Sequence, residues 1–315
     1  MFELVRLGDG KASLAFSRCE AGKGATFDEE GRGLRTGNRI EFAPPVLSGG
    51  YNRLKIVVTV KLVPDTNADK RIDPSTKRLV RAGVETVLNP FDEYAIEAAL
   101  QLKEKAGADT TVTVLTMGPE SGKEVVRKAL AMGADDAVIV SDPALEGSDV
   151  SVTGYVLSQA LKKHGFDLII CGGLAEDGNT GGVSGAIAEH LGIPGLTNAA
   201  KIEIADGALR VERETDSGHQ TVTAPLPAML MVTMGIGEPR YASLKGIMGA
   251  KKKQIAIVPI AELALDRPVG TDGAKTELLD IAKPAERGKG RVVVAEDGPA
   301  GAKIILDFLK ERKLI

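Results

Sequence analysis

The sequence contains no tryptophan, and aromatic residues make up only 3% of its 315 positions. So few aromatic side chains leave little with which to build the stacking platforms that bind single-stranded nucleic acid. The formal net charge is −3 at pH 7, so the chain also lacks the basic excess that a polyanion attracts. We therefore expect no nucleic-acid partner.

Cysteine and histidine are also scarce. Cys19 and Cys171 lie far apart and form no Cys-x-x-Cys motif, which argues against a disulfide framework and fits a reducing compartment. The three histidines, His164, His190 and His219, show no metal-ligand spacing and no catalytic dyad. No apolar run is long enough to cross a bilayer, and no secretory signal is visible. We expect a cytoplasmic chain that has no metal site, no membrane insertion and no catalytic residue of its own.

The first 53 residues differ from the rest of the chain. They are rich in glycine and arginine and show neither a strand nor a helix period. At Leu54 the apolar run LKIVVTVKLV begins, and it predicts a buried strand. We expect Leu54 to be the natural start, encoded by an alternative start codon, which would make residues 1–53 a mis-assigned start. The alternative is a genuine flexible N-terminal extension.

From Leu54 onward, apolar strands alternate with amphipathic helices. Strands are predicted at 54–63, 111–118, 136–142 and 167–173, and helices at 89–107, 119–133, 151–164 and 180–191. This alternation predicts an α/β fold with a Rossmann-like parallel sheet, for which the common strand order is 3-2-1-4-5. In this order the reversal point lies between the first and fourth strands, so a ligand is expected beyond their carboxyl ends.

The pattern changes after residue 195. Turns at Asp206-Gly207 and Ser217-Gly218 predict an antiparallel hairpin set that extends or flanks the sheet. We expect the α/β domain to span 54–260 and residues 261–315 to form a linker and a C-terminal arm. The arm ends in an amphipathic helix, which either reaches for a partner or packs back on its own domain.

A glycine-rich turn, CGGLAEDGNTGGVSGAIAEHLG, joins the fourth predicted strand to the fourth helix. Backbone N–H groups and the helix dipole at such a turn favour an anion. The turn is neither G-x-G-x-x-G nor a P-loop, so ATP hydrolysis is not expected. A purely structural turn is the alternative.

Across the expected site lies the helix start NPFDEYA, in which Asn89 can cap the helix and Pro90 suits its first position.

Four stretches together resemble the β subunit of the electron transfer flavoprotein family. They are VKLVPD, NPFDEYAIEAALQLKE, AEDGNTGGVSGAIAEHLGIP and GEPRYASLKGIMGAKKK, and the likeness covers residues 54–315 in one register. The resemblance implies a heterodimer with an α subunit, which holds most of the shared FAD. It implies a nucleotide in the β subunit as well, either AMP or, in bifurcating members, a second FAD.

The resemblance also implies partners and a role. The chain would carry electrons between acyl-CoA dehydrogenases, as in fatty acid β-oxidation, and a redox acceptor. That acceptor would be a quinone oxidoreductase, or NADH and ferredoxin if the complex bifurcates. The stretches VPDT, RIDPSTKRLVRAG and NPFDEYA look more like the bifurcating group than the mitochondrial type.

Site residues follow from the resemblance position by position. The implied nucleotide-binding residues are Thr59, Asn89, Pro90, Phe91, Asp92, Met117, Asp177, Gly178, Asn179, Thr180, Gly181, Gly182, Val183 and Ser184. The turn departs from the family pattern in two places, since Gly182 stands where Gln is general and Asn179 where Asp is usual. AMP and a second FAD therefore both stay open.

The connection 235–253 resembles the loop with which the family recognises acyl-CoA dehydrogenases. A leucine at the position of Leu244 would insert into a hydrophobic pocket of the partner, and the lysines would steer acidic partners. The implied partner-binding residues are Arg240, Tyr241, Leu244, Ile247, Met248 and Lys252. The alternative is that the apolar members of this set fold into the core.

Two other classes of protein are rivals. A stand-alone ATP- or AMP-binding protein of the universal stress type shares the architecture, but it would lack EPRYASLKGIM and the C-terminal arm. A dehydrogenase with its own catalytic groups would need a Rossmann fingerprint and a His-Asp or Tyr-Lys pairing, and the sequence shows neither.

Overall fold

The computed structural model describes residues 53–205, 208–281 and 292–315. The predictions for residues 1–52, for the turn at 206–207 and for the linker at 282–291 lie outside the described residues. The chain divides into two compact units, and the second of them takes in the residues from Leu279 onward. Among the described residues, no helix has the length and apolar character to cross a membrane.

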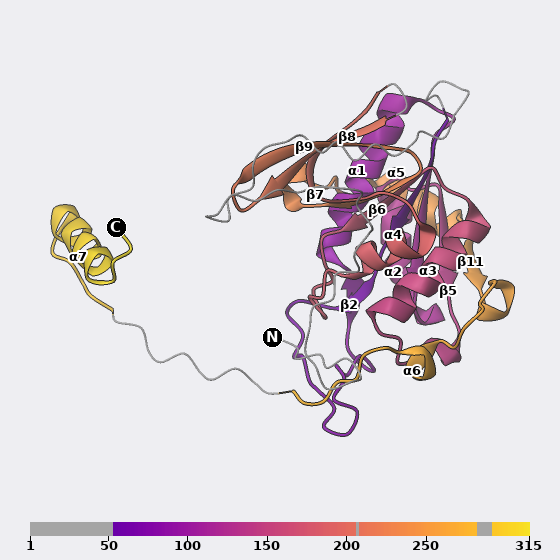
Figure 1. The fold of residues 1–315 in the computed structure, drawn as a ribbon, viewed down its shortest axis with the longest axis horizontal. Helices are drawn as coiled ribbons and strands as arrows, with labels where there is room; N and C mark the ends of the chain where they lie inside the picture. The colour runs from indigo at the N-terminus through magenta and orange to yellow at the C-terminus, as the bar shows by residue number, and fades with distance from the viewer. Residues whose placement is uncertain (1–52, 206–207, 282–291) are drawn as a thin grey trace, which may run out of the picture. The chain divides into compact units, whose positions relative to one another are not determined.

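A nine-stranded sheet forms the centre of the larger unit (Figure 1). Its strands are β1 (Lys55–Thr59), β4 (Thr111–Met117), β5 (Asp136–Val140), β6 (Leu168–Gly172), β7 (Gly195–Ala205), β8 (Ala208–Thr215), β9 (Gly218–Pro225), β10 (Ala228–Val232) and β11 (Ile255–Val258). The order is β11-β5-β4-β1-β6-β10-β7-β8-β9. The strands from β11 to β7 are parallel, and β8 and β9 continue antiparallel. The α/β class, the 3-2-1-4-5 order (β5-β4-β1-β6-β10) and the antiparallel extension are thus confirmed.

Helices pack on both faces of the parallel strands. They are α1 (Pro90–Ala106), α2 (Lys123–Met132), α3 (Val150–His164) and α4 (Val183–Leu191). The 3-10 turns are η1 (Glu120–Gly122), η2 (Pro143–Leu145), η3 (Met234–Ile236) and η4 (Ile260–Glu262). Helix α5 (Leu244–Lys252) packs against α2, and the short α6 (Gly270–Gly273) packs against η2. Ile96 of α1 shares one buried cluster with Val58 of β1, whereas Val156 of α3 shares another with Val57. Because neighbouring side chains of a strand point to opposite faces, β1 contributes to both cores of a three-layered unit.

The first predicted strand is shorter than expected. β1 ends at Thr59, and β2 (Leu62–Pro64) pairs instead with β3 (Thr86–Leu88) in a separate two-stranded sheet. The chain leaves the main sheet at Lys61, whose N–H donates to Asp92 Oδ2 at 2.7 Å and whose carbonyl accepts from the Asn89 N–H at 3.0 Å. The start of α1 thus binds the N–H and carbonyl groups of Lys61, which would pair with a neighbouring strand if β1 continued. The apolar pattern of residues 54–63 does not reveal this contact, because α1 begins about thirty positions later.

The connection 235–253 is more regular than a loop, because residues 244–252 form α5. The Ser243 side chain caps this helix by accepting from the Gly246 N–H at 3.0 Å. Leu244 is 76% exposed, so it does not fold into the core. The exposed apolar side chains of Leu244, Ile247 and Met248 therefore lie on a helix.

The smaller unit contains one helix, α7 (Gly298–Glu311), among its described residues. Asp297 caps it by accepting from the Ala300 N–H at 2.8 Å, and Pro299 lies in its first turn. The structure describes every residue of α7 and buries none of them; Ile305 and Phe308 are exposed. The predicted C-terminal helix is present, and its role as an arm stays a prediction.

Candidate functional site

The expected ligand position lies at the carboxyl ends of β1 and β6, where the strand order reverses. We call the residues there, Thr59, 89–92 and 172–184, the switch-point site. Thr59 ends β1 opposite Cys171 of β6, and its hydroxyl donates to Cys171 Sγ at 3.0 Å. Both side chains are buried, so Thr59 forms part of the base of the site.

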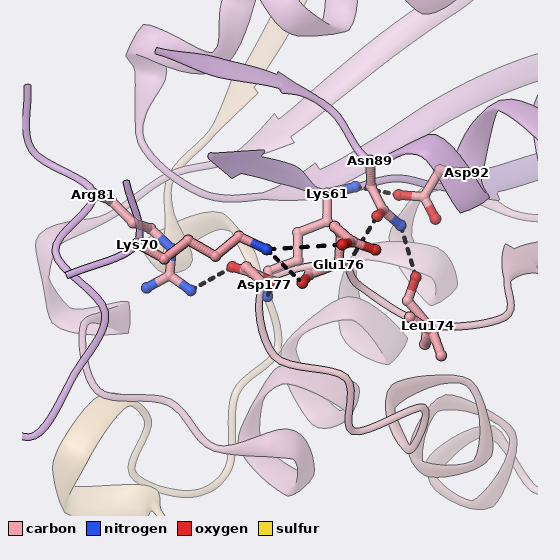
Figure 2. Close-up of polar contacts among 8 residues, drawn as sticks. All are labelled: Lys61, Lys70, Arg81, Asn89, Asp92, Leu174, Glu176 and Asp177. Carbon is pink, nitrogen blue, oxygen red and sulfur yellow. Dashed lines mark hydrogen bonds and ion pairs between the residues drawn. The ribbon is translucent and has the colours of Figure 1, made fainter. Parts of the chain in front are cut away.

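Asn89 joins α1 to the glycine-rich turn. Its side chain is fully buried; Nδ2 donates to the Leu174 carbonyl at 2.8 Å, and Oδ1 accepts from the Glu176 N–H at 3.1 Å (Figure 2). It occupies the N-cap position of α1 but makes no capping hydrogen bond. The prediction that this side chain caps the helix is therefore wrong, because the turn competes for the same amide. Asn89 instead holds the two walls of the site together.

Gly172 permits the close approach of β6 to α1. A Cβ at this position would lie 2.4 Å from Asp92 Oδ1 and 2.7 Å from the carbonyl atoms of Phe91. Gly172 is not among the predicted site residues, which include only the later glycines of the turn. The sequence signal for Gly172 is the Gly-Gly pair at the end of an apolar strand, because a glycine in such a position often allows another backbone to approach the strand closely.

Asp92 is a buried carboxyl group in the first turn of α1. Burial raises the pKa of Asp92 to about 7, against the opposing effects of hydrogen bonds from Asn89 and Lys61. The charge on Lys61 favours the carboxylate and that on Asp177 disfavours it, both more weakly than burial. Asp92 therefore changes its protonation near neutral pH.

This raised pKa predicts a pH dependence of stability that asparagine at position 92 would abolish. Between the ordinary pKa of 3.8 and about 7 the folded state binds more protons than the unfolded chain, so the free energy of unfolding falls as pH rises. The fall attributable to Asp92 is at most about 1.4 kcal/mol per pH unit. Urea unfolding of wild type and Asp92→Asn at pH 5 and pH 7.5 should show the variant gaining relative stability at the higher pH. A constant difference between the two proteins would contradict the assignment.

Three cations lie over the turn, and the sequence analysis did not identify them. Lys61 Nζ pairs with Asp177 Oδ1 at 2.8 Å, the Arg81 guanidinium binds Asp177 Oδ2, and Lys70 Nζ lies 3.7 Å from Glu176 Oε1 (Figure 2). The Asp177 side chain is only 1% exposed. Burial favours its neutral form, but Lys61 and Arg81 outweigh burial and hold the pKa of Asp177 below its usual range. Asp177 thus clamps the connection between β2 and β3 onto the turn.

The turn itself offers free backbone donors. Asn179 and Gly181 have positive φ values of 51° and 61°, which fold the chain tightly before α4. Within the described part of the chain, the N–H groups of Thr180, Gly181 and Gly182 have no hydrogen-bond partner. Free donors beside a helix N-terminus form an anion site, so the turn fits a phosphate group.

The remaining predicted site residues lie at the starts of α1 and α4 and in the turn. Pro90 begins α1, Val183 begins α4, Gly178 is exposed, and Phe91 is partly buried. Ser184 is buried, and its hydroxyl donates to a sulfur, Met231 Sδ, at 3.5 Å.

Met117 lies one strand away, at the end of β4 beside β1. It lines a pocket of about 430 Å³ together with Ser141, Pro143 and Leu145. This volume lies in the range of small-molecule sites. Three acidic residues also line the pocket, so its wall combines apolar, hydroxyl and carboxylate groups: they are Glu120, Asp142 and Glu146. The residues of this pocket are therefore further candidate ligand contacts, at the carboxyl end of β4 beside the switch-point site.

The residues predicted to bind a partner fall into two groups. Tyr241 is 99% exposed, and the other exposed apolar residues of the group are Leu244, Ile247 and Met248. We call these four residues the α5 surface; Lys252, at the end of α5, is also exposed. Arg240 differs, because its guanidinium forms ion pairs with Glu97 and Glu104 of α1.

Comparison with known proteins identifies the family. A family model described as "Electron transfer flavoprotein domain" matches residues 76–263. The chain is 40% identical over 272 residues to "Electron transfer flavoprotein subunit beta" of Megasphaera elsdenii, a match that covers 83% of this chain and 100% of the relative. The protein of the same description from Mycobacterium tuberculosis (strain ATCC 25618 / H37Rv) is 42% identical over 266 residues, or 82% and 99% of the two chains. The "Caffeyl-CoA reductase-Etf complex subunit CarD" of Acetobacterium woodii is 35% identical over 264 residues, or 83% and 100%.

These matches cover almost the full length of each relative, and they span both the glycine-rich turn and the α5 surface. They leave no support for the universal-stress or dehydrogenase alternatives. The chain belongs to the electron transfer flavoprotein β-subunit family, and its role is that of an electron-carrier subunit.

Proposed function

We propose that this chain pairs with an electron transfer flavoprotein α subunit in the cytoplasm and carries electrons between acyl-CoA dehydrogenases and a redox acceptor. FAD held chiefly by the α subunit would supply the electron transfer. The switch-point site would bind a further nucleotide, either AMP or a second FAD. The observation that carries this proposal is the turn at the β1–β6 reversal, with its free N–H groups at 180–182.

AMP and FAD both contain an adenosine phosphate group. The switch-point site and the pocket at Met117 would bind the phosphate and the ring of this shared group. The N–H groups of 180–182 would bind a phosphate, and the one positive charge by which Lys61 and Arg81 together exceed Asp177 would partly balance the phosphate charge. The pocket at Met117 would take a planar ring. The stretches VPDT and RIDPSTKRLVRAG favour a bifurcating complex, with a second FAD, NADH and ferredoxin. A single-flavin carrier with AMP and a quinone oxidoreductase is the alternative.

Two surfaces would bind proteins. The α5 surface would contact the dehydrogenase, because it groups Leu244 with Tyr241 and Met248 in exposed positions. Helix α7 would serve as the arm on the α subunit, because Ile305 and Phe308 leave it with exposed apolar side chains. Exposed apolar groups of this kind mark interaction sites.

The nucleotide proposal predicts that Asp177→Ala weakens nucleotide binding. The substitution removes the acceptor that clamps Lys61 and Arg81 to the turn, so the turn loses its fixed geometry. Both ion pairs of Asp177 are contacts within the protein, so the loss acts through the geometry of the turn, and a cost of about 1.4 kcal/mol would weaken nucleotide binding about tenfold. The measurement is AMP and FAD per heterodimer, by chromatography after denaturation.

Asp216→Ala is the matched control, because Asp216 is exposed in the turn between β8 and β9. Its nucleotide content should equal that of wild type. Equal content in Asp177→Ala and wild type, after dilution and re-isolation, would show that the switch-point site does not hold the nucleotide.

A further inference from the structure

Arg240 lies immediately before the α5 surface and is bound by two carboxylates of α1. Its Nε and Nη2 donate to Glu97 Oε2 and Oε1 at 2.7 and 3.0 Å, and its Nη1 donates to Glu104 Oε1 at 2.6 Å. The backbone N–H of Arg240 also donates to Glu97 Oε2, at 3.1 Å. A bidentate arginine–carboxylate pair fixes orientation as well as charge, so both the side chain and the backbone of residue 240 are held on α1.

Glu97 is a buried carboxylate whose surroundings keep it in position to bind Arg240. It is 5% exposed, and Gln101 Nε2 donates to its Oε1 at 2.9 Å. Burial opposes its ionisation, but hydrogen bonds from Arg240 and Gln101 outweigh burial and hold the pKa of Glu97 below its usual range. The carboxylate therefore stays charged at neutral pH and keeps the pair intact.

Two further contacts fix α5 itself. A Cβ at Gly246 would lie only 2.3 Å from the Ala131 carbonyl oxygen, so α5 touches α2 backbone to backbone. At the other end, Arg127 Nη1 donates to the Ala250 carbonyl at 2.9 Å. The backbone of α5 is thus held on both sides while Leu244 remains exposed.

We propose that Arg240 is a positioning residue for partner recognition. Its guanidinium fixes the segment 240–243, so that Tyr241 and Leu244 project from a backbone that already has its bound conformation. A segment ordered beforehand loses less conformational entropy on association, which strengthens binding without adding a contact. This inference rests on the proposed function, because it requires a dehydrogenase to dock on the α5 surface.

The test uses the heterodimer co-purified with its α subunit. Arg240→Gln should raise the dehydrogenase's KM for the flavoprotein about tenfold, with kcat and flavin content unchanged. Arg240→Lys should fall between wild type and Arg240→Gln, because lysine keeps the charge but not the planar fork. Amide hydrogen exchange should speed up in both variants at Gly246 and Ile247, whose N–H groups donate to Ser243 at the end of the segment that Arg240 fixes.

Arg240→Gln leaves Glu97 as a buried charge without its partner, so the double variant Glu97→Gln/Arg240→Gln removes both charges at once. It should also raise KM. The matched control is Arg210→Gln, since among the described residues Arg210 forms an ion pair only with Glu203, at 3.9 Å and exposed on both sides, so KM should not change. Unchanged KM in the folded Arg240 variants, or a KM change that comes with loss of flavin, would overturn the positioning role.

A parallel Leu244→Ala variant separates this inference from the proposed function. If Leu244→Ala raises KM and the Arg240 variants do not, the docking surface stands and the positioning role fails. If Leu244→Ala leaves KM unchanged, the α5 surface is not the docking site and both fail.

Discussion

Leu244→Ala is expected to raise the dehydrogenase's KM for this flavoprotein about 10- to 100-fold. Leu244 is 76% exposed on the first turn of α5, beside exposed Tyr241 and Met248. Burying one leucine side chain contributes about 1.5–3 kcal/mol, which suits a partner that must leave after each transfer. The measurement is steady-state reduction of the flavoprotein by an acyl-CoA dehydrogenase over a range of flavoprotein concentrations.

Flavin content should not change in this variant, because Leu244 lies outside the switch-point site. Met234→Ala is a suitable control, since it shortens an apolar side chain that is 59% exposed in η3 and belongs neither to the α5 surface nor to the C-terminal arm. It should leave KM near the wild-type value. A drop in flavin content that parallels the drop in activity would contradict the separation between partner docking and cofactor binding.

Gly172→Ala is expected to lower the free energy of unfolding by about 1–3 kcal/mol. The new methyl group would meet Asp92 Oδ1 at 2.4 Å and the Phe91 carbonyl at 2.7 Å, so the start of α1 must move away from β6. That movement would also strain the Asn89 contacts to the turn and reduce nucleotide content. Urea unfolding and nucleotide analysis of the same preparation would measure both effects.

Gly185→Ala supplies the matched control for this substitution. Gly185 lies within α4, and a Cβ there would meet no atom within 4 Å. Alanine is a better helix former than glycine, so stability should rise by up to about 1 kcal/mol. If both variants were as stable as wild type and held as much nucleotide, the close β6–α1 contact would not matter to the site.

The sheet could be predicted from the sequence because the signals were local and repeated. Each apolar strand such as 167–173 was followed by a helix with a recognisable start, and alternation of this kind restricts the topology strongly. The reversal between β1 and β6 then located the site before any side chain was placed. The glycine-rich turn could be found because its composition marks it on its own.

The contacts that complete the site could not be predicted, because they join residues far apart in the sequence. Lys61 and Arg81 lie in or beside a connection without period, and both pair with Asp177 about a hundred positions later. Asn89 looks like an ordinary cap until the turn competes for its side chain. Such pairings depend on the finished fold.

Helix α5 was missed for a different reason. Its sequence, LKGIMGAKK, contains Gly246 and Gly249, which disfavour a helix, and it is only nine residues long. Packing of Gly246 against α2 and the Ser243 cap form the helix, and both are visible only in the structure. The exposure of Leu244 follows from this arrangement.

We propose that the switch-point site of this flavoprotein subunit holds a nucleotide apart from the FAD shared with the α subunit. The most direct measurement is the FAD and AMP content of the co-expressed heterodimer, for wild type and for Asp177→Ala. We expect one shared FAD together with AMP or a second FAD in wild type, and a reduced content of that additional nucleotide alone in the variant after dilution and re-isolation. A single FAD with no other nucleotide in wild type, or full nucleotide content in the variant, would contradict it.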